Sequence, residues 1–231
     1  MCCVHVRASE SLIRNRSLPL EPIGFKGLVN SGTPGFYSTL TTVTATDKSS
    51  LRKKIRQHRR QLTRAQQIHA AHLLCLRIMR TAWWRKAHSI AFYWPADGEI
   101  SPLPLLRWSL RAGKHCYLPV VTGKSLEFRR YERGRRLRRN RFGIPEPHAT
   151  HQRAAHQLDV ILMPLVAFDE GCNRLGMGAG FYDRALAARE KNIPLRIGVA
   201  HELQKIAQVP TDPWDIPLHA VVTERRIYRR R

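Results

Sequence analysis

The stretch Asn173-Arg174-Leu175-Gly176-Met177-Gly178-Ala179-Gly180-Phe181-Tyr182-Asp183 decides how this chain folds. It follows an apolar run over residues 160–168 and precedes a helix expected from about Arg184 to Lys191. Glycines at every second position free the backbone to adopt positive φ and let a ligand approach the bare main chain. A strand, a glycine-rich loop and a helix in succession form an anion cradle from backbone N–H groups. The stretch therefore predicts a phosphate or nucleotide site.

Two charged side chains mark the ends of this stretch. Arg174 offers a planar donor fork suited to phosphate, and Asp183 offers a carboxylate suited to Mg²⁺. The spacing matches neither common phosphate motif: Gly-x-x-x-x-Gly-Lys-Ser/Thr is absent, and Phe181 replaces the third glycine of Gly-x-Gly-x-x-Gly. The glycines alone are also compatible with a tight turn after a buried strand. The ordinary ATPase and dinucleotide-binding fingerprints are excluded, and a phosphate site with a metal is the local hypothesis.

Length and composition favour one α/β domain with a substantial core, because 43% of the 231 residues are hydrophobic. No apolar run approaches the roughly 18 residues that a membrane span needs, so no membrane partner is expected. An odd number of cysteines without a Cys-x-x-Cys pair argues against a disulfide framework or a structural zinc site. It predicts a reducing, cytoplasmic compartment. These cysteines are Cys2, Cys3, Cys75, Cys116 and Cys172.

The charge is strongly basic, with 40 Lys and Arg against 17 Asp and Glu. This excess favours an anionic partner such as nucleic acid, a nucleoside triphosphate or a polyglutamate tail. Six arginines lie within residues 133–141, so an RNA-binding arm formed by this segment and the terminal arginines is one hypothesis. Because no aromatic residues are interleaved for base stacking, a solvated basic loop is preferred. Residues 227–231 are expected to form a basic tail that little holds in place.

Residues 1–46 differ in composition from the rest of the chain. They are rich in Ser, Thr, Gly and Pro, with Glu10 and Glu21 as their only acidic residues. This predicts a disordered or removable extension. A basic, acid-poor, Ser-rich composition also suits an organelle transit peptide, which would change the location, and an upstream misplaced start codon is a third alternative. Residues 47–231 are expected to form the functional domain.

From residue 48 onward, helical and strand patterns alternate. Helices are predicted over 48–60, from a capping box at 63–66, and over 102–112. Strands are predicted over 89–94, 115–121, 126–131, 159–167, 195–200 and 220–223. The alternation predicts a single three-layer α/β domain with a largely parallel sheet flanked by helices. The central run over 159–167 is apolar enough to be covered on both faces.

Two pairs of charged residues are candidates for contacts with a ligand. Asp97 and Glu99 follow the predicted strand 89–94, at its carboxyl end, where α/β sheets bind ligands. Lys48 and Arg52 are four residues apart, so they share one face of a helix and could reach a phosphate chain. Solvated turn carboxylates and a solvated basic helix are the alternatives.

Residues 163–169 and 171 together with 173–183 resemble the motif of the 5-formyltetrahydrofolate cyclo-ligases, also called methenyltetrahydrofolate synthetases. Shorter similarities at 48–52, 97–99, 142–147, 215–218 and 222–224 occur in the family's order, so the resemblance covers residues 48–224. It implies that ATP phosphorylates the formyl oxygen of 5-formyltetrahydrofolate. Nitrogen 10 then closes onto the activated carbon, and 5,10-methenyltetrahydrofolate, ADP and phosphate result.

The resemblance also implies a role for individual residues. Arg174 and Tyr182 would be catalytic, and Asp183 and Asp215 would hold Mg²⁺. The substrate 5-formyltetrahydrofolate, with or without a polyglutamate tail, would face Trp94, Glu99, Met177, Gly178, Ala179, Gly180 and Phe181. ATP would contact Lys48, Ser49, Ser50, Leu51, Arg52, Arg174, Leu175, Gly176, Met177, Gly178, Ala179, Gly180, Phe181 and Tyr182. The enzyme is expected to be a monomer that does not require nucleic acid.

Four residues depart from those common in the family. Met177 and Ala179 alter the folate or phosphate contacts implied between the glycines. Phe181 lacks a hydroxyl group but keeps a stacking surface, and His219 stands where an Asp is common. A relative that keeps the fold but has lost activity is therefore a third hypothesis.

Overall fold

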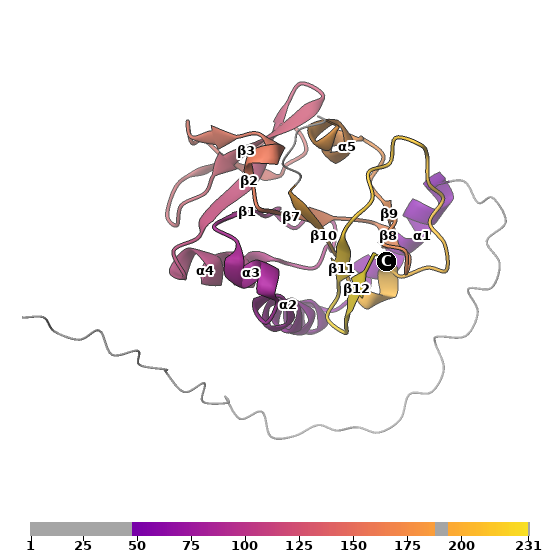
Figure 1. The fold of residues 1–231 in the computed structure, drawn as a ribbon. Coiled ribbons are helices and arrows are strands. Elements are labelled where there is room, and N and C mark those ends of the chain that lie inside the picture. Colours follow the sequence, from indigo (N-terminus) through magenta and orange to yellow (C-terminus); the bar gives the residue numbers. More distant parts are fainter. Residues whose placement is uncertain (1–47, 188–193, 231) are drawn as a thin grey trace, which may run out of the picture. The chain divides into compact units, whose positions relative to one another are not determined.

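The computed structural model describes residues 48–187 and 194–230, and these residues are built around one eight-stranded sheet (Figure 1). Its strand order is β12-β11-β10-β7-β1-β2-β3-β6. The five strands from β11 to β2 are mutually parallel, whereas β12, β3 and β6 pair antiparallel at the two edges. The strands are β1 Ser89–Ala91, β2 His115–Thr122, β3 Ser125–Arg130, β6 Gln152–Arg153, β7 Val160–Pro164, β10 Leu195–Val199, β11 Ala220–Val222 and β12 Ile227–Arg229.

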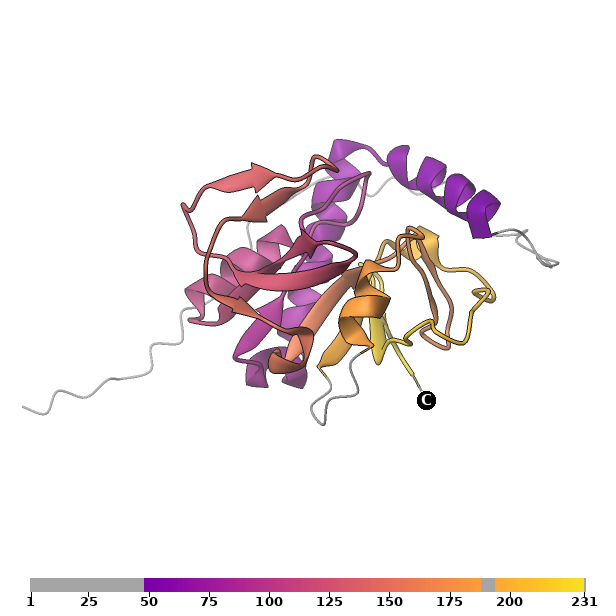
Figure 2. The same cartoon turned by 90° about the horizontal axis from the view of Figure 1, so that it is seen from above.

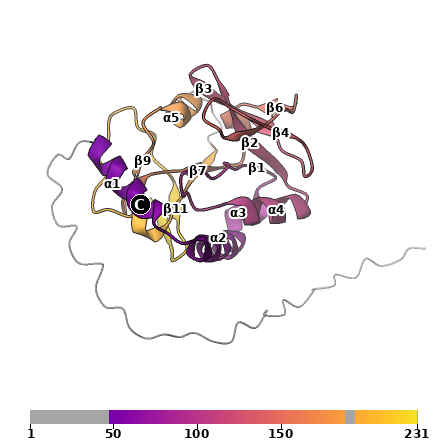
Figure 3. The same cartoon turned by 180° about the vertical axis from the view of Figure 1, so that it is seen from behind.

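Helices cover both faces of this sheet, as Figures 1 and 3 show. On one face lie α2 (Arg64–Met79), α3 (Ala82–Lys86) and α4 (Leu103–Arg111), and on the other lies α5 (Phe181–Leu186). Successive strand residues point to opposite faces. Thus Val160 and Leu162 join the core beneath α2 and α4, whereas Ile161 and Met163 join the core on the α5 side. The predicted three-layer α/β fold with a largely parallel sheet is confirmed.

The first helix, α1 (Lys48–Arg60), packs away from the sheet (Figure 2). Its residues Leu51 and Ile55 join a small core formed by the hairpin of β8 (Ala167–Phe168) and β9 (Arg174–Leu175). The interpretation of α1 as a solvated basic helix is wrong at Arg59, whose side chain has no exposed surface. A buried guanidinium requires acceptors, and α1 is therefore fixed by polar contacts as well as by its apolar face.

Several elements differ from the sequence predictions. The arginine-rich loop at 133–141 contains the strand β4 (Leu137–Arg139), which pairs with β5 (Pro145–Pro147). The expected loose tail is wrong for β12, because its residues pair with β11. The helix expected from Arg184 begins earlier, at Phe181, and ends at Leu186. Ala187 is no longer helical, whereas residues 188–191 of the expected span and the predicted 1–46 extension lie outside the described residues.

The sheet order places one topological switch point between β1 and β7. From β1 the chain continues to β2 on one side, whereas from β7 it continues to β10 on the other. Parallel α/β sheets bind ligands in the crevice beyond the carboxyl ends of strands at such a point. The turn after β1 follows a strand that ends here, and the glycine-rich stretch after the separate β8–β9 hairpin lines the same cavity. The fold thus brings together two segments that lie about 80 residues apart in the chain.

Candidate active site

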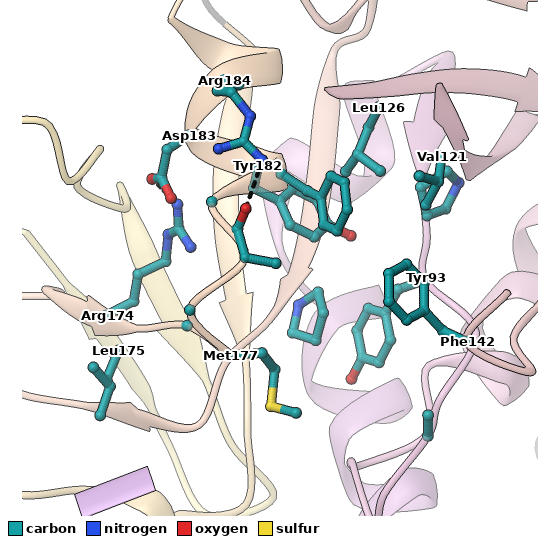
Figure 4. A pocket seen from close by; sticks show the side chains of 18 of the residues that line it. Tyr93, Val121, Leu126, Phe142, Arg174, Leu175, Met177, Tyr182, Asp183 and Arg184 are labelled. Atoms are coloured by element: carbon teal, nitrogen blue, oxygen red, sulfur yellow. Dashed lines mark hydrogen bonds and ion pairs between the residues drawn. The ribbon is translucent and has the colours of Figure 1, made fainter. Parts of the chain in front are cut away.

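A cavity of about 900 Å³ opens at this edge of the sheet. Figure 4 shows that its two sides differ: Arg174 and Asp183 lie on one side, Tyr93, Val121, Leu126 and Phe142 lie on the other, and Met177 lies between them. The first side continues to Lys48 and Arg52 of α1 and to the segment 212–215. The cavity therefore combines a charged side with an apolar side, and the glycine-rich stretch separates them.

Arg174 is held beneath the glycine-rich stretch rather than within it. It lies in β9, is 8% exposed, and its guanidinium pairs with the carboxylate of Asp183 in the first turn of α5. Asp183 Oδ1 also accepts the backbone N–H of Ile216 at 3.3 Å. The buried Nε of Arg174 has no hydrogen-bond partner. An unpartnered buried donor of a charged group is costly, so this side chain is suited to an anionic ligand.

Arg52 reaches the glycine-rich stretch from α1. Its Nε donates to the carbonyl of Gly176 at 2.8 Å. Gly178 has φ of +99°, and a Cβ atom there would lie 3.4 Å from Arg52 Cζ. The second glycine is therefore required for its backbone conformation, which L-residues rarely adopt, and it lies in van der Waals contact with a cation.

At the N-terminal end of α1, Lys48 contacts a segment from the far end of the chain. Its Nζ lies 2.7 Å from Asp212 Oδ2 and 3.2 Å from Asp215 Oδ2. Burial lowers the pKa of Lys48, but hydrogen bonds to both carboxylates outweigh burial and raise it above the ordinary value. Asp215 Oδ2 also accepts the backbone N–H of Asp212 at 2.8 Å, which closes the turn. Lys48 is therefore a stable cation at the cavity wall.

The turn after β1 is fixed to α1 by Asp97. Its Oδ2 lies 2.6 Å from Arg56 Nε and 3.0 Å from the NH2 group of the fully buried Arg59, while Oδ1 pairs with Arg60. Asp97 has a positive φ of 51°, and its carbonyl accepts Arg59 Nε at 2.9 Å. Both carboxylates predicted at this strand end line the cavity, and Asp97 in addition pairs with the arginines of α1.

Glu99 and two tyrosines form a polar group inside the apolar side. Burial raises the pKa of Glu99 to about 7, even though the backbone N–H of Ala96 donates to its Oε2 at 3.1 Å. Burial and the charge of Glu99 raise the pKa of Tyr93 and of Tyr182. The Tyr93 hydroxyl donates to the carbonyl of Ile100. Burial thus brings the pKa of Glu99 well above that of an ordinary carboxyl group.

The segment 140–147 closes the apolar side, and sequence analysis did not assign it to the site. Asn140 Oδ1 accepts the backbone N–H of Phe142 at 2.8 Å and that of Ile144 at 3.0 Å. Glu146 Oε1 accepts Asn140 Nδ2 at 2.7 Å and the N–H of Val121 at 3.0 Å. Phe142 packs edge-on against Phe181, with ring centroids 6.0 Å apart. The similarity to the family at residues 142–147 was the sequence signal that could have assigned this segment to the site.

The cavity brings together most of the residues predicted for the site. Lys48, Arg52, Trp94, Glu99, Asp215 and all residues from Arg174 to Asp183 line it. Ser49 and Ser50 are exposed on α1, and Leu51 packs in the core against the hairpin instead of lining the cavity. Sequence analysis missed Tyr93, Asn140, Phe142, Glu146, Arg184, Asp212 and Trp214. His219 lies apart from the cavity lining, where its Nδ1 accepts the N–H of Arg196 at 3.0 Å.

Two observations bear on metals and membranes. Within residues 48–187 and 194–230, no group of three or more His, Cys, Asp or Glu side chains is arranged to hold a metal ion. Mg²⁺ does not require such a group, because it binds through one or two carboxylates with water and substrate phosphates. In the described part of the chain, no helix has the length and apolar character needed to cross a membrane.

Fold and site together define the chain as an α/β protein with a cavity, lined on one side by cations, at the carboxyl edge of a largely parallel sheet. The sequence profile of the 5-formyltetrahydrofolate cyclo-ligase family matches residues 44–224, and the chain belongs to that family. It is therefore an enzyme of the ligase class. The family assignment predicted from the glycine-rich stretch is confirmed.

Similar proteins agree in sequence and in structure. The 5-formyltetrahydrofolate cyclo-ligase of Escherichia coli (strain K12) is 40% identical over 179 residues, covering 75% of this chain and 98% of that protein. Its counterpart from Haemophilus influenzae is 37% identical over 180 residues, covering 76% and 96%. The solution structure of Aquifex aeolicus 5,10-methenyltetrahydrofolate synthetase superposes with a TM-score of 0.71 at 34% identity, covering 80% of this chain and 93% of that one.

Proposed function

We propose that the protein catalyses the ATP-dependent cyclisation of 5-formyltetrahydrofolate to 5,10-methenyltetrahydrofolate, with release of ADP and phosphate. The observation that carries this proposal is one cavity with a cationic side and an apolar side, joined by a stretch whose Arg174 has a buried, unpartnered donor. A reaction that transfers a phosphoryl group to a bound organic substrate needs both sides. We expect the protein to act in the cytoplasm, because Cys75, Cys116 and Cys172 are free thiols and a reducing compartment keeps thiols free.

On the cationic side, Arg174, Arg52 and Lys48 would bind the triphosphate. Arg174 directs its guanidinium into the cavity wall below the glycines, where charge accumulates on the transferring group. Arg52 already contacts the carbonyl of Gly176, so it would hold the stretch in place while it lines the cavity. Phosphoryl transfer depends mainly on positioning and charge neutralisation, which these side chains supply.

Asp183 and Asp215 fit the proposed Mg²⁺ site. Both line the cavity, and each is paired with a cation: Asp183 with Arg174, and Asp215 with Lys48. Two carboxylates beside phosphate-binding groups form the donor set that Mg²⁺ takes in nucleotide sites. When bound, Mg²⁺ would neutralise charge on the phosphate oxygens.

On the apolar side, Trp94, Phe181 and Tyr182 would enclose the folate, and Met177 to Phe181 would contact its formyl end. The formyl oxygen attacks the terminal phosphorus, and ADP leaves. Nitrogen 10 then bonds to the activated carbon, phosphate departs with its oxygen, and nitrogen 10 loses a proton. Glu99, with its pKa raised by burial to about 7, is placed to accept that proton.

The test is an assay with purified protein, ATP, Mg²⁺ and 5-formyltetrahydrofolate, in which the methenyl product is followed by its near-ultraviolet absorbance. Arg174→Ala should lower turnover by about a hundredfold or more, the usual effect of removing a charge-stabilising donor, with the circular dichroism spectrum retained. Arg138→Ala, at an exposed position on β4, is the matched control and should behave as wild type. Absence of product from folded wild-type protein would rule out the proposed function, and full activity of Arg174→Ala would rule out its role.

A further inference from the structure

Trp214 is a large aromatic side chain at the cavity mouth that the proposed reaction does not use. It lines the cavity and is 71% exposed, so it contributes little to the packing of the described fold. An exposed indole beside a ligand site is costly to hydrate and offers a flat surface for stacking. The question is which part of a ligand would lie on it.

Given the proposed function, the order of the cations along α1 indicates the direction in which the nucleotide extends. The transferring phosphate must lie between the glycine-rich stretch and the apolar side, where the folate binds. The rest of the nucleotide then extends away from the apolar side, along Arg52 and next along Lys48. Lys48 lies one helical turn before Arg52, about 6 Å along the helix axis. The ribose and the base are therefore expected beyond Lys48.

The segment beyond Lys48 is the one that carries Trp214. Lys48 Nζ contacts the carboxylates of Asp212 and Asp215, the residues at positions two before and one after the indole. The other aromatic residues of the described cavity lining come from the end of β1, from the 140–147 segment and from α5, on the apolar side.

The backbone under Trp214 is held in place, as a stacking surface requires. The N–H of Asp212 donates to Asp215 Oδ2 at 2.8 Å, and the N–H of Ile216 donates to Asp183 Oδ1 at 3.3 Å. Pro213 directly before the indole restricts the backbone further. The segment is thus tied to both α1 and α5.

We infer that Trp214 stacks against the purine base of the nucleotide and contributes to the preference for a nucleoside triphosphate over a bare polyphosphate. This inference rests on the proposed function for the identity of the nucleotide. Stacking on a π-face tolerates different bases, so Trp214 would secure binding of a nucleobase without reading its hydrogen-bonding groups.

The test measures equilibrium binding of MgATP and of magnesium tripolyphosphate by calorimetry without folate. For Trp214→Ala, the Kd of MgATP should rise about tenfold, the scale of one lost base–aromatic stack, with the tripolyphosphate Kd unchanged. Trp214→Phe should recover most of the loss. Trp108→Ala is the matched control, because Trp108 is 44% exposed on α4, outside the cavity lining, where it stacks with Arg111.

An unchanged Kd of MgATP in Trp214→Ala would overturn the inference. An equal rise in the Kd of MgATP and of tripolyphosphate would also overturn it, because Trp214 would then act only through Lys48. The turnover assay separates this failure from that of the proposed function. A wild type that forms methenyl product while Trp214→Ala binds MgATP normally refutes the inference alone. A wild type that binds no MgATP refutes both.

Discussion

Asp97 holds α1 against the turn after β1, and the substitution Asp97→Asn isolates the contribution of its charge. Asparagine has the same shape and tolerates the positive φ of 51° at this position. It keeps the main-chain carbonyl that accepts Arg59 Nε at 2.9 Å. What it removes is the negative charge 3.0 Å from the NH2 group of Arg59.

The cost follows from the burial of Arg59. Its side chain is 0% exposed and that of Asp97 is 17% exposed, so solvent screens the pair only weakly. Removing one partner of a buried ion pair costs about 3–5 kcal/mol. Because the carbonyls of Asp97 and Leu165 still accept from Arg59, we expect a loss near the lower limit, about 3 kcal/mol. For a protein of this size, that loss lowers Tm by about 6–12 °C.

The loss should also depend on pH. Burial raises the pKa of Asp97, but the hydrogen bonds from Arg56 and Arg60 outweigh burial and hold the pKa below its ordinary value. A carboxyl group with a depressed folded-state pKa stabilises the protein above its unfolded-state pKa. That stability is lost as pH falls through the folded-state pKa, so the gap between wild type and variant should narrow in acid.

Thermal and urea unfolding, followed by circular dichroism at neutral and acidic pH, measure both effects. Arg60→Gln is the matched control, because the Arg60 side chain is 56% exposed and its pair with Asp97 should contribute about 1 kcal/mol or less. The reasoning fails if Asp97→Asn unfolds within about 2 °C of wild type, or if Arg60→Gln loses as much stability.

Two further changes test the cavity. Gly178→Ala forces an L-residue to adopt a φ of +99° beside the Arg52 guanidinium, so we expect a stability loss of about 1–2 kcal/mol and a raised KM for ATP; a KM for ATP and a stability equal to those of wild type would contradict the strain at this position. Glu99→Gln removes a carboxyl group whose folded-state pKa is raised by burial to about 7. Because ionisation of this group is less favourable in the folded state, the stability of the wild-type protein falls as the pH rises from the unfolded-state pKa to about 7. The variant should therefore be stabilised relative to wild type by about 2 kcal/mol more at pH 8 than at pH 5, measured by urea unfolding, and a pH-independent difference would contradict the shift.

Local pattern predicted the sheet and the anion-binding stretch because both depend on short-range chemistry. A continuous apolar run from Val160 to Met163 and glycines at every second position after Arg174 can each be recognised within about ten residues. The paired helix residues Lys48 and Arg52 were recognised as sharing one face, and both line the cavity. Their role in binding phosphate was implied by the family resemblance and not by their position in the helix.

Features that depend on distant partners could not be predicted in this way. Arg59 has the same sequence context as its solvated neighbours, and its burial depends on acceptors far away in the chain, the Asp97 turn and the Leu165 carbonyl. β12 lacks a strand pattern of its own and is ordered by β11 and by Tyr228, whose hydroxyl donates to Glu202. Asp212 and Trp214 enter the site because the chain returns to Lys48 more than 160 residues later.

Two cations of the cavity are already matched by carboxylates before any ligand arrives. Lys48 faces Asp212 and Asp215, and Arg174 faces Asp183. A ligand that binds here therefore replaces existing ion pairs instead of neutralising unpaired cations. A triphosphate alone would leave carboxylates without counterions, and a divalent cation alone would leave Lys48 without its acceptors. If the proposed function holds, linkage would make the nucleotide and the metal each promote the binding of the other, and the site would favour a neutralised metal–nucleotide pair over other polyanions.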